Sequence, residues 1–324
     1  MSQTPPDIFD NPELTPFLLR LQESDAAVRR IAVLDLADLE DEEALPTLID
    51  TLLRDPDASV RLEAARVLAA WETPEVVTAL LDGLTDADTE VATAAAQSLS
   101  ELKDTSLGRL LVERANHASA FVRTAVLRGL RELRYPQAYA PAVKLLDDAD
   151  ANVRREAVTV IGWLKQSDAL TDLARLAAND PVVEVRRAAT GALGLAADSK
   201  VLPALYTALN EREWQVREEA AITLGKIKLA ESETALLNAL DDEYWQVKLQ
   251  AARALGRLRA RSVVAKLGEL FQHPISNLRK EVALALGEIG DKAALPILEP
   301  AIDDADPDVR KSVRIALAQI NTAA

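Results

Sequence analysis

Apolar side chains recur along this chain with the spacing of one helix face. Counting from Val216, apolar residues follow at +4, +5, +8 and +11, which matches a helix of about 3.6 residues per turn. A shorter apolar run occupies residues 235–240, and the next helical pattern begins near Trp245. Runs that alternate with period two and Asn-Gly hairpin turns are both missing from the sequence. The pattern predicts pairs of helices, joined by short polar turns and without β-strands.

The same pair of helices returns along almost the whole chain. Each longer helix opens with a Val or Leu that recurs every 31 or 32 residues. These signature residues are Val28, Val60, Val91, Val122, Val153, Val185, Val216, Val247, Leu278 and Val309. One short pair cannot bury its apolar face, whereas stacked pairs can. We therefore predict an all-α fold, an α-solenoid of about ten two-helix repeats. It forms one array over residues 11–321, between a flexible leader (1–10) and a tail (322–324).

Composition removes several classes of function. The chain has 324 residues, no Cys and two His, which excludes disulfides, thiol catalysis, thiolate metal sites and sites built on three His. Acidic residues outnumber basic ones 52 to 37, for a net charge of −15, which disfavours nucleic acid and anionic membranes as partners. The sequence begins without a secretory signal and holds no long uncharged apolar stretch. We expect a cytoplasmic protein without a membrane partner.

The longer helices share the motif Val-Arg-x-x-Ala-Ala-x-x-Leu-Gly-x-Ile/Leu, clearest over 216–227, 247–258 and 278–289. This motif resembles the HEAT repeat and, more narrowly, the short 31-residue HEAT-like repeats of the phycobilisome-lyase (E/Z) type. The resemblance implies an armadillo-like helical array whose second helices line a concave face. It also implies protein–protein interaction, and the narrower subtype implies the handling of a bilin.

An Arg follows the signature residue in most repeats, and two interpretations are open. It could form a basic binding stripe, or a ladder in which each Arg pairs with an acidic residue of a turn; the planar guanidinium favours the ladder. The copies are Arg29, Arg61, Arg123, Arg154, Arg186, Arg217, Arg279 and Arg310, replaced by Lys248 and Ala92 in two repeats.

Aspartates in the turns suggest calcium at first sight. Asp148 and Asp304 each begin a run of alternating oxygen ligands, but neither run has the Gly and the Glu of an EF-hand loop. Helix capping explains these aspartates, and we predict no metal site. His117 and His273 lie five repeats apart, and we expect both in surface turns.

The candidate binding residues lie at positions that the core does not determine. Positions +2, +3, +6 and +10 of the second helices should be exposed, and in the fourth to eighth repeats they carry six cations and four carboxylates, a balance of +2. Aromatic residues and Arg are enriched at interface hot spots. The alternative is that Trp214 and Trp245, at the same position of adjacent repeats, pack on each other, and that the Arg residues are scattered over a solvated face. The predicted partner-binding residues are Arg128, Arg155, Trp163, Arg187, Trp214, Lys226, Trp245, Arg253 and Arg257.

The sequence shows no phosphate-binding loop, nucleophile elbow or catalytic triad, and we predict no catalytic residue and no cofactor. Neither His is followed by Glu, which excludes the iron-binding dipeptides of HEAT-type deoxyhypusine hydroxylases. We expect a non-enzymatic scaffold or adaptor that binds an acidic protein partner on its concave face, as part of a hetero-oligomer. A bilin lyase or tetrapyrrole-handling chaperone subunit is the alternative, and nucleic-acid binding is a third.

Overall fold

The computed structural model describes residues 11–165, 167–195 and 198–322, and the regular elements in these ranges are all helices. The predicted leader (1–10) lies outside the described residues, as do the last two residues of the predicted tail; Thr322 instead ends a helix. None of the described helices is long and apolar enough to cross a bilayer. The chain divides into two compact units, up to Leu164 and from Lys165. The single array over residues 11–321 stays a prediction.

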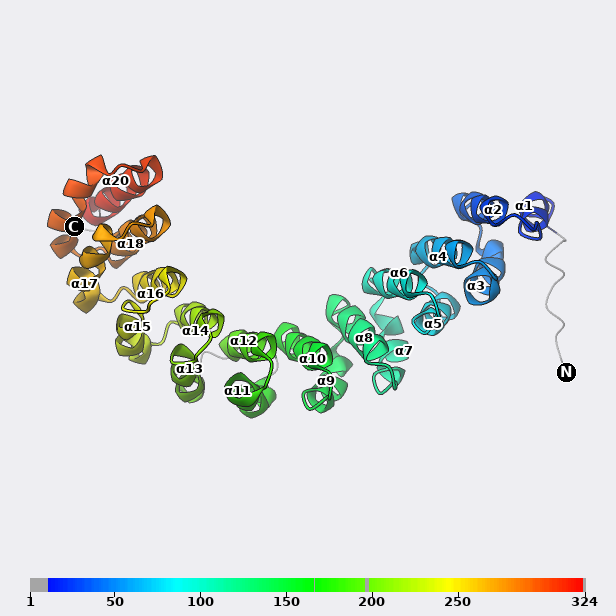
Figure 1. Cartoon of the computed structure of the whole chain (residues 1–324), viewed down its shortest axis with the longest axis horizontal. Helices are drawn as coiled ribbons and strands as arrows, with labels where there is room; N and C mark the ends of the chain where they lie inside the picture. The colour runs from blue at the N-terminus through cyan, green and yellow to red at the C-terminus, as the bar shows by residue number, and fades with distance from the viewer. Residues whose placement is uncertain (1–10, 166, 196–197, 323–324) are drawn as a thin grey trace. The chain divides into compact units, whose positions relative to one another are not determined.

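Both units are built from pairs of helices, and Figure 1 shows the second helices of each unit following one another in chain order. The first unit holds α1 (Thr15–Arg20), α2 (Ala26–Asp38), α3 (Leu45–Arg54), α4 (Ala58–Val67), α5 (Pro74–Gly83), α6 (Thr89–Ser100), α7 (Gly108–Glu113), α8 (Ala120–Glu132), α9 (Tyr139–Leu145) and α10 (Ala151–Leu164).

The second unit continues the pattern with α11 (Leu170–Asn179), α12 (Val183–Ala192), α13 (Leu202–Leu209), α14 (Trp214–Ile227), α15 (Glu233–Ala239), α16 (Trp245–Leu258), α17 (Val264–Glu269), α18 (Ser276–Ile289), α19 (Leu295–Leu298) and α20 (Pro307–Thr322). The even-numbered helices are the second helices of their pairs. The described residues therefore form ten two-helix repeats, and the predicted all-α solenoid fold is confirmed.

Local sequence explains where the helices begin. Ahead of α4, the side chain of Asp57 accepts a hydrogen bond from the backbone N–H of Ser59 at 2.9 Å, which satisfies one of the unpaired donors of the first turn. Asp25 and Asp88 do the same for α2 and α6. Several first helices carry a proline in their first turn, where no N–H is needed.

The second helices supply most of the core. In α14 the residues at the signature position and at +4, +5 and +8 are fully buried, as the periodicity predicts. The Gly at +9 lets neighbouring second helices approach closely. At Gly256 an added Cβ would lie 2.8 Å from the Cα of Ala285 on α18, so a side chain here would push the two helices apart.

The Arg that follows the signature residue forms a ladder between successive repeats. Arg123 donates from two nitrogens to the carboxylate of Asp148 at 2.8 and 2.7 Å, and from the third to the carbonyls of His117 and Ala118. The described pairs of this kind are Arg29–Asp55, Arg61–Asp86, Arg123–Asp148, Arg186–Glu211, Arg217–Asp242 and Arg279–Asp304. The ladder is confirmed, and the basic stripe is wrong for these residues.

The two histidines take the place of the turn acid. Nδ1 of His117 accepts a hydrogen bond from the N–H of Ser119, and Nδ1 of His273 accepts one from Ile275, as Asp148 does from Asp150. The residues that would pair with these histidines are those that follow the signature residue one repeat earlier, and there the sequence has Ala92 and Lys248 instead of Arg. Arginine is therefore absent from this position in the two repeats whose following turn offers no carboxylate.

Candidate protein-binding surface

The nine predicted binding residues all lie on second helices. In chain order they are Arg128 on α8, Arg155 and Trp163 on α10, Arg187 on α12, Trp214 and Lys226 on α14, and Trp245, Arg253 and Arg257 on α16. The first three belong to the first unit and the other six to the second.

The residues in the second unit do not form one cluster. Trp214 and Trp245 are the first residues of α14 and α16, whereas Lys226 and Arg257 lie near the ends of the same helices. Twelve residues of helix separate the members of each pair, a rise of about 18 Å. The aromatic and the basic residues therefore occupy opposite ends of these helices.

Three of the predicted arginines are paired with carboxylates on the next second helix. Arg253 donates two hydrogen bonds to Glu281, at 2.9 and 2.7 Å. This hydrogen-bonded carboxylate raises the pKa of Arg253 above its usual value. The remaining pairs are longer, Arg187–Glu219 at 3.5 Å and Arg128–Glu156 at 3.9 Å.

The partner carboxylates correct the sequence-based exposure pattern. Glu156 and Glu281 occupy +3 positions that we expected to be exposed, yet both are buried. Each is held by arginine: Glu156 also binds Arg131 at 2.9 Å. Glu156 and Glu219 already belong to the predicted balance of +2, and Glu281 lowers it by one further charge to +1.

The aromatic residues have partners other than those we expected. The Trp214 ring stacks on Tyr244, with ring centroids 5.6 Å apart and planes at 14°, whereas the alternative interpretation had Trp214 packing on Trp245. Arg217 of the ladder lies over the same Tyr244 ring at 5.5 Å. Trp163 is different, because 51% of its surface is exposed, and the guanidinium of Arg134 lies 5.0 Å from its ring centroid.

Arg134 belongs to a set of cations that sequence reasoning missed. Arg134 lies at position +12 of its repeat, two residues after the last residue of α8. Its backbone has the left-handed conformation in which helices often end. Lys165, Lys228 and Arg259 share this position and conformation, with φ between 53° and 54°. Basic residues at +12 were readable from the sequence, but our list of exposed positions stopped at +10.

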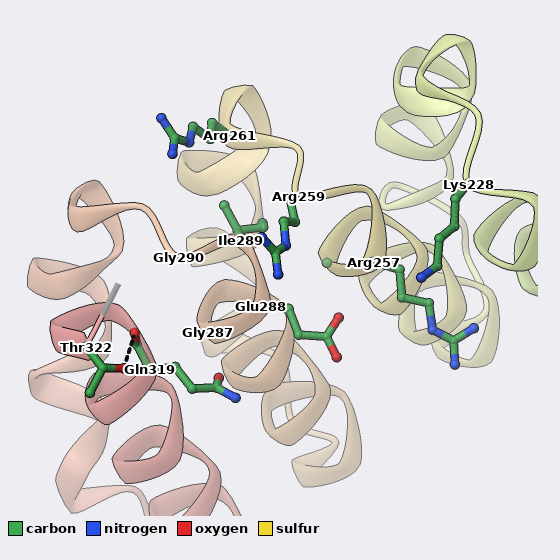
Figure 2. Close-up of a pocket in the computed structure, with 11 residues that line it drawn as sticks. Lys228, Arg257, Arg259, Arg261, Gly287, Glu288, Ile289, Gly290, Gln319 and Thr322 are labelled. Atoms are coloured by element: carbon green, nitrogen blue, oxygen red, sulfur yellow. Dashed lines mark hydrogen bonds between the residues drawn. The ribbon is translucent and has the colours of Figure 1, made fainter. Parts of the chain in front are cut away.

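In the second unit two of these cations, Lys228 and Arg259, line a hollow of about 760 Å³ at the ends of α14, α16 and α18. We call it the basic pocket and define it by Lys228, Arg257, Arg259 and Arg261, together with Glu288 and parts of α18 and α20. Figure 2 shows the Arg259 side chain extending toward Glu288, whereas the Arg261 side chain points away from Glu288. Of the nine predicted residues, only Arg257 lines this pocket.

The repeated helix pairs match a known family of proteins. A family model for HEAT repeats matches residues 11–100, 108–194, 177–237 and 233–318. The chain belongs to the HEAT-repeat family. No curated protein matches this HEAT-repeat sequence.

Solved structures resemble the HEAT-repeat chain over most of its length. YibA of Escherichia coli is 19% identical, over 83% of this chain and 98% of that one, with a TM-score of 0.61. Yeast importin-β (Kap95p) is 16% identical, over 97% of this chain and 52% of that one, with a TM-score of 0.68. Kap95 in a complex with Nup1 gives 16% identity, coverage of 97% and 51%, and a TM-score of 0.70. At these identities the likeness is one of fold.

Proposed function

We propose that this HEAT-repeat chain is a non-enzymatic scaffold that binds a protein partner along the exposed face of its second helices. One side of each helix is occupied by the core and the Arg ladder, which leaves the other side free to vary. The observation that carries the proposal is Trp163: a tryptophan half exposed on this face, with Arg134 over its ring. Trp and Arg are the residues that most often dominate binding at protein interfaces.

The architecture supports the same function. A stack of short helices held by bidentate ion pairs is rigid before binding, so little conformational entropy is lost when a partner is bound. The similar Kap95 fold is solved in a complex with Nup1, which illustrates such a partner for that protein. The proposal includes the acidic partner, the hetero-oligomer, the concave placement of this face and the cytoplasmic location expected from the sequence. The phycobilisome-lyase subtype stays a prediction, and we do not extend it to a bilin-binding function.

Affinity capture from a lysate of the source organism, read by mass spectrometry, tests this scaffold function. The first bait is the wild-type chain, and the second carries Trp163→Ala and Lys226→Glu on second helices. The third bait is a matched control on first helices, Leu53→Ala with Arg109→Glu; Leu53 is 42% exposed, and the Arg109 side chain is 61% exposed. All four positions are on the surface, so circular dichroism should show the same helix content for every bait.

We expect a protein enriched by the wild type and by the control, and bound about thirtyfold more weakly by the second bait, since loss of one hot-spot residue costs about 2 kcal/mol. Loss with the control alone would move the binding face to the first helices and contradict the assignment. The absence of any enriched protein with the wild-type bait would contradict the scaffold function itself.

A further inference from the structure

The basic pocket has the opposite charge to the chain that contains it. Four cations and one carboxylate line it, a local balance of +3 in a protein of net charge −15. Among the described residues, Lys228, Arg257 and Arg259 form no salt bridge, and Arg261 is only 4.0 Å from Asp291. In the described pairs of the ladder, by contrast, the Arg that follows the signature residue is bound to a carboxylate of the following repeat. We propose that the basic pocket binds an acidic peptide segment.

The spacing of the cations favours an extended ligand. Lys228 follows α14 and Arg259 follows α16, and neighbouring packed helices lie about 10 Å apart. An extended ligand can reach both charges without requiring the two side chains to converge. An extended peptide advances about 3.3 Å per residue, so acidic side chains three residues apart repeat at about the same 10 Å.

Backbone groups in the pocket favour a peptide over a nucleic acid. The last carbonyls of a helix have no partner within the helix. In the part of the chain that the structure describes, nothing donates a hydrogen bond to the carbonyls of Gly287 and Ile289, two residues that line the pocket. A peptide supplies N–H donors for such carbonyls as well as carboxylates for the cations. A phosphodiester backbone supplies only acceptors, so it can satisfy the cations but not these carbonyls.

Glu288 is the carboxylate that lines the basic pocket beside its four cations. Its carboxylate lies close to the backbone of Gly256, 3.2 Å from where a Cβ would stand, between the ends of α16 and α18. It opposes an incoming carboxylate, so the neutral variant Glu288→Gln should bind an acidic peptide more tightly. A gain of affinity from removing one charge is a result that a merely damaged protein would not give.

Fluorescence anisotropy with purified full-length chain and a labelled Glu-Gly-Ser repeat peptide tests the proposal. The pocket variant carries Arg257→Glu and Arg259→Glu; the left-handed position of Arg259 accepts glutamate, because Glu40 occupies the same position after α2 with φ 53°. The matched control, Arg212→Glu with Lys311→Glu, makes the same charge change at exposed positions near the beginnings of α14 and α20. A Gln-Gly-Ser peptide and an oligothymidylate are the comparison ligands.

We expect the acidic peptide to bind the wild type and the control alike, the pocket variant about tenfold or more weakly, and Glu288→Gln about twofold more tightly, with affinity falling as salt rises. Equal affinity for the wild type and the pocket variant would overturn the proposal. So would equal binding of the neutral peptide, or binding of the oligothymidylate as tight as that of the acidic peptide.

The proposal rests on the scaffold function in one respect: it takes the acidic peptide to be part of a partner protein. The capture experiment and the peptide-binding experiment can each fail without the other. Peptide binding at the pocket without a captured partner would contradict the scaffold alone. Capture that depends on Trp163, without peptide binding, would contradict the pocket alone.

Discussion

The same substitution, Gly to Ala, should stabilise the protein at one glycine of a second helix and fail to do so at another. At Gly162 in α10 an added Cβ would meet no heavy atom within 4 Å apart from its chain neighbours and the backbone of its own helix. At Gly256 in α16 it would lie 2.8 Å from the Cα of Ala285 and 3.0 Å from its Cβ. Ordinary carbon–carbon contacts are about 3.5–4.0 Å, so α16 and α18 must separate by roughly 1 Å to accept Gly256→Ala.

The magnitudes follow from these contacts. Alanine in a helix interior is favoured over glycine by about 1 kcal/mol, and Gly162→Ala should raise the free energy of unfolding by about that amount. Overpacking a close contact costs about 1–3 kcal/mol. Gly256→Ala gains the same helix propensity but bears this cost, so the two variants should differ by about 1–3 kcal/mol.

Equilibrium unfolding in urea, followed by circular dichroism and tryptophan fluorescence, measures this difference. Trp163 adjoins Gly162, and Trp245 opens the helix that contains Gly256, so each site has a nearby fluorophore. Hydrogen exchange in α10 and α16 should place each effect locally, because repeat arrays unfold in neighbouring units. If Gly256→Ala stabilised the protein as much as Gly162→Ala does, close helix approach would not be the reason for that glycine.

Three further predictions concern the ladder and its histidines. Asp148→Asn should lower the free energy of unfolding by about 1–3 kcal/mol, since it leaves the guanidinium of Arg123 without its charged partner; urea titration with Asp38→Asn, at an exposed position of α2, as the comparison measures this, and equal losses would argue against the ladder. Hydrogen bonding by Arg279 lowers the pKa of Asp304, so the stability from this pair is present above about pH 4 and is lost as pH falls through the lowered value; unfolding at pH 7 and in acid should show Asp304→Asn to be less acid-sensitive than the wild type. Burial, with Lys248 and Arg279 nearby, lowers the pKa of His273 below about 6.5. The unfolded chain then takes up the proton first, and stability should fall from pH 7 to pH 5; His273→Gln should flatten that interval, and an unchanged slope would refute the assignment.

Most of the fold could be predicted from the sequence, because each repeat shows the same pattern of apolar and polar positions. A period of 31 residues, the core positions after Val216 and the starts of α14 and α16 were all readable, since burying one helix face requires that spacing. The ladder was readable too, because arginine and a turn acid recur together. These features depend on residues that every repeat must provide.

The candidate site was less readable, because it depends on which side chains meet between repeats. Glu281 stands at a position that helix periodicity marks as exposed, and only the bond to Arg253 explains its burial. Likewise, the sequence could not show that Trp214 stacks on Tyr244 when Trp245 is the next residue. The left-handed cations after the helices depend on backbone conformations that no hydrophobic pattern reveals.

The two interruptions of the ladder have a mechanical consequence. Each arginine fastens one repeat to the turn of the next, so under tension along the chain the load passes through these ion pairs as well as through the core. Between Ala92 and His117, and between Lys248 and His273, that fastening is missing from the sequence. When the protein is pulled from its ends, these junctions are where extension should begin, one inside each compact unit.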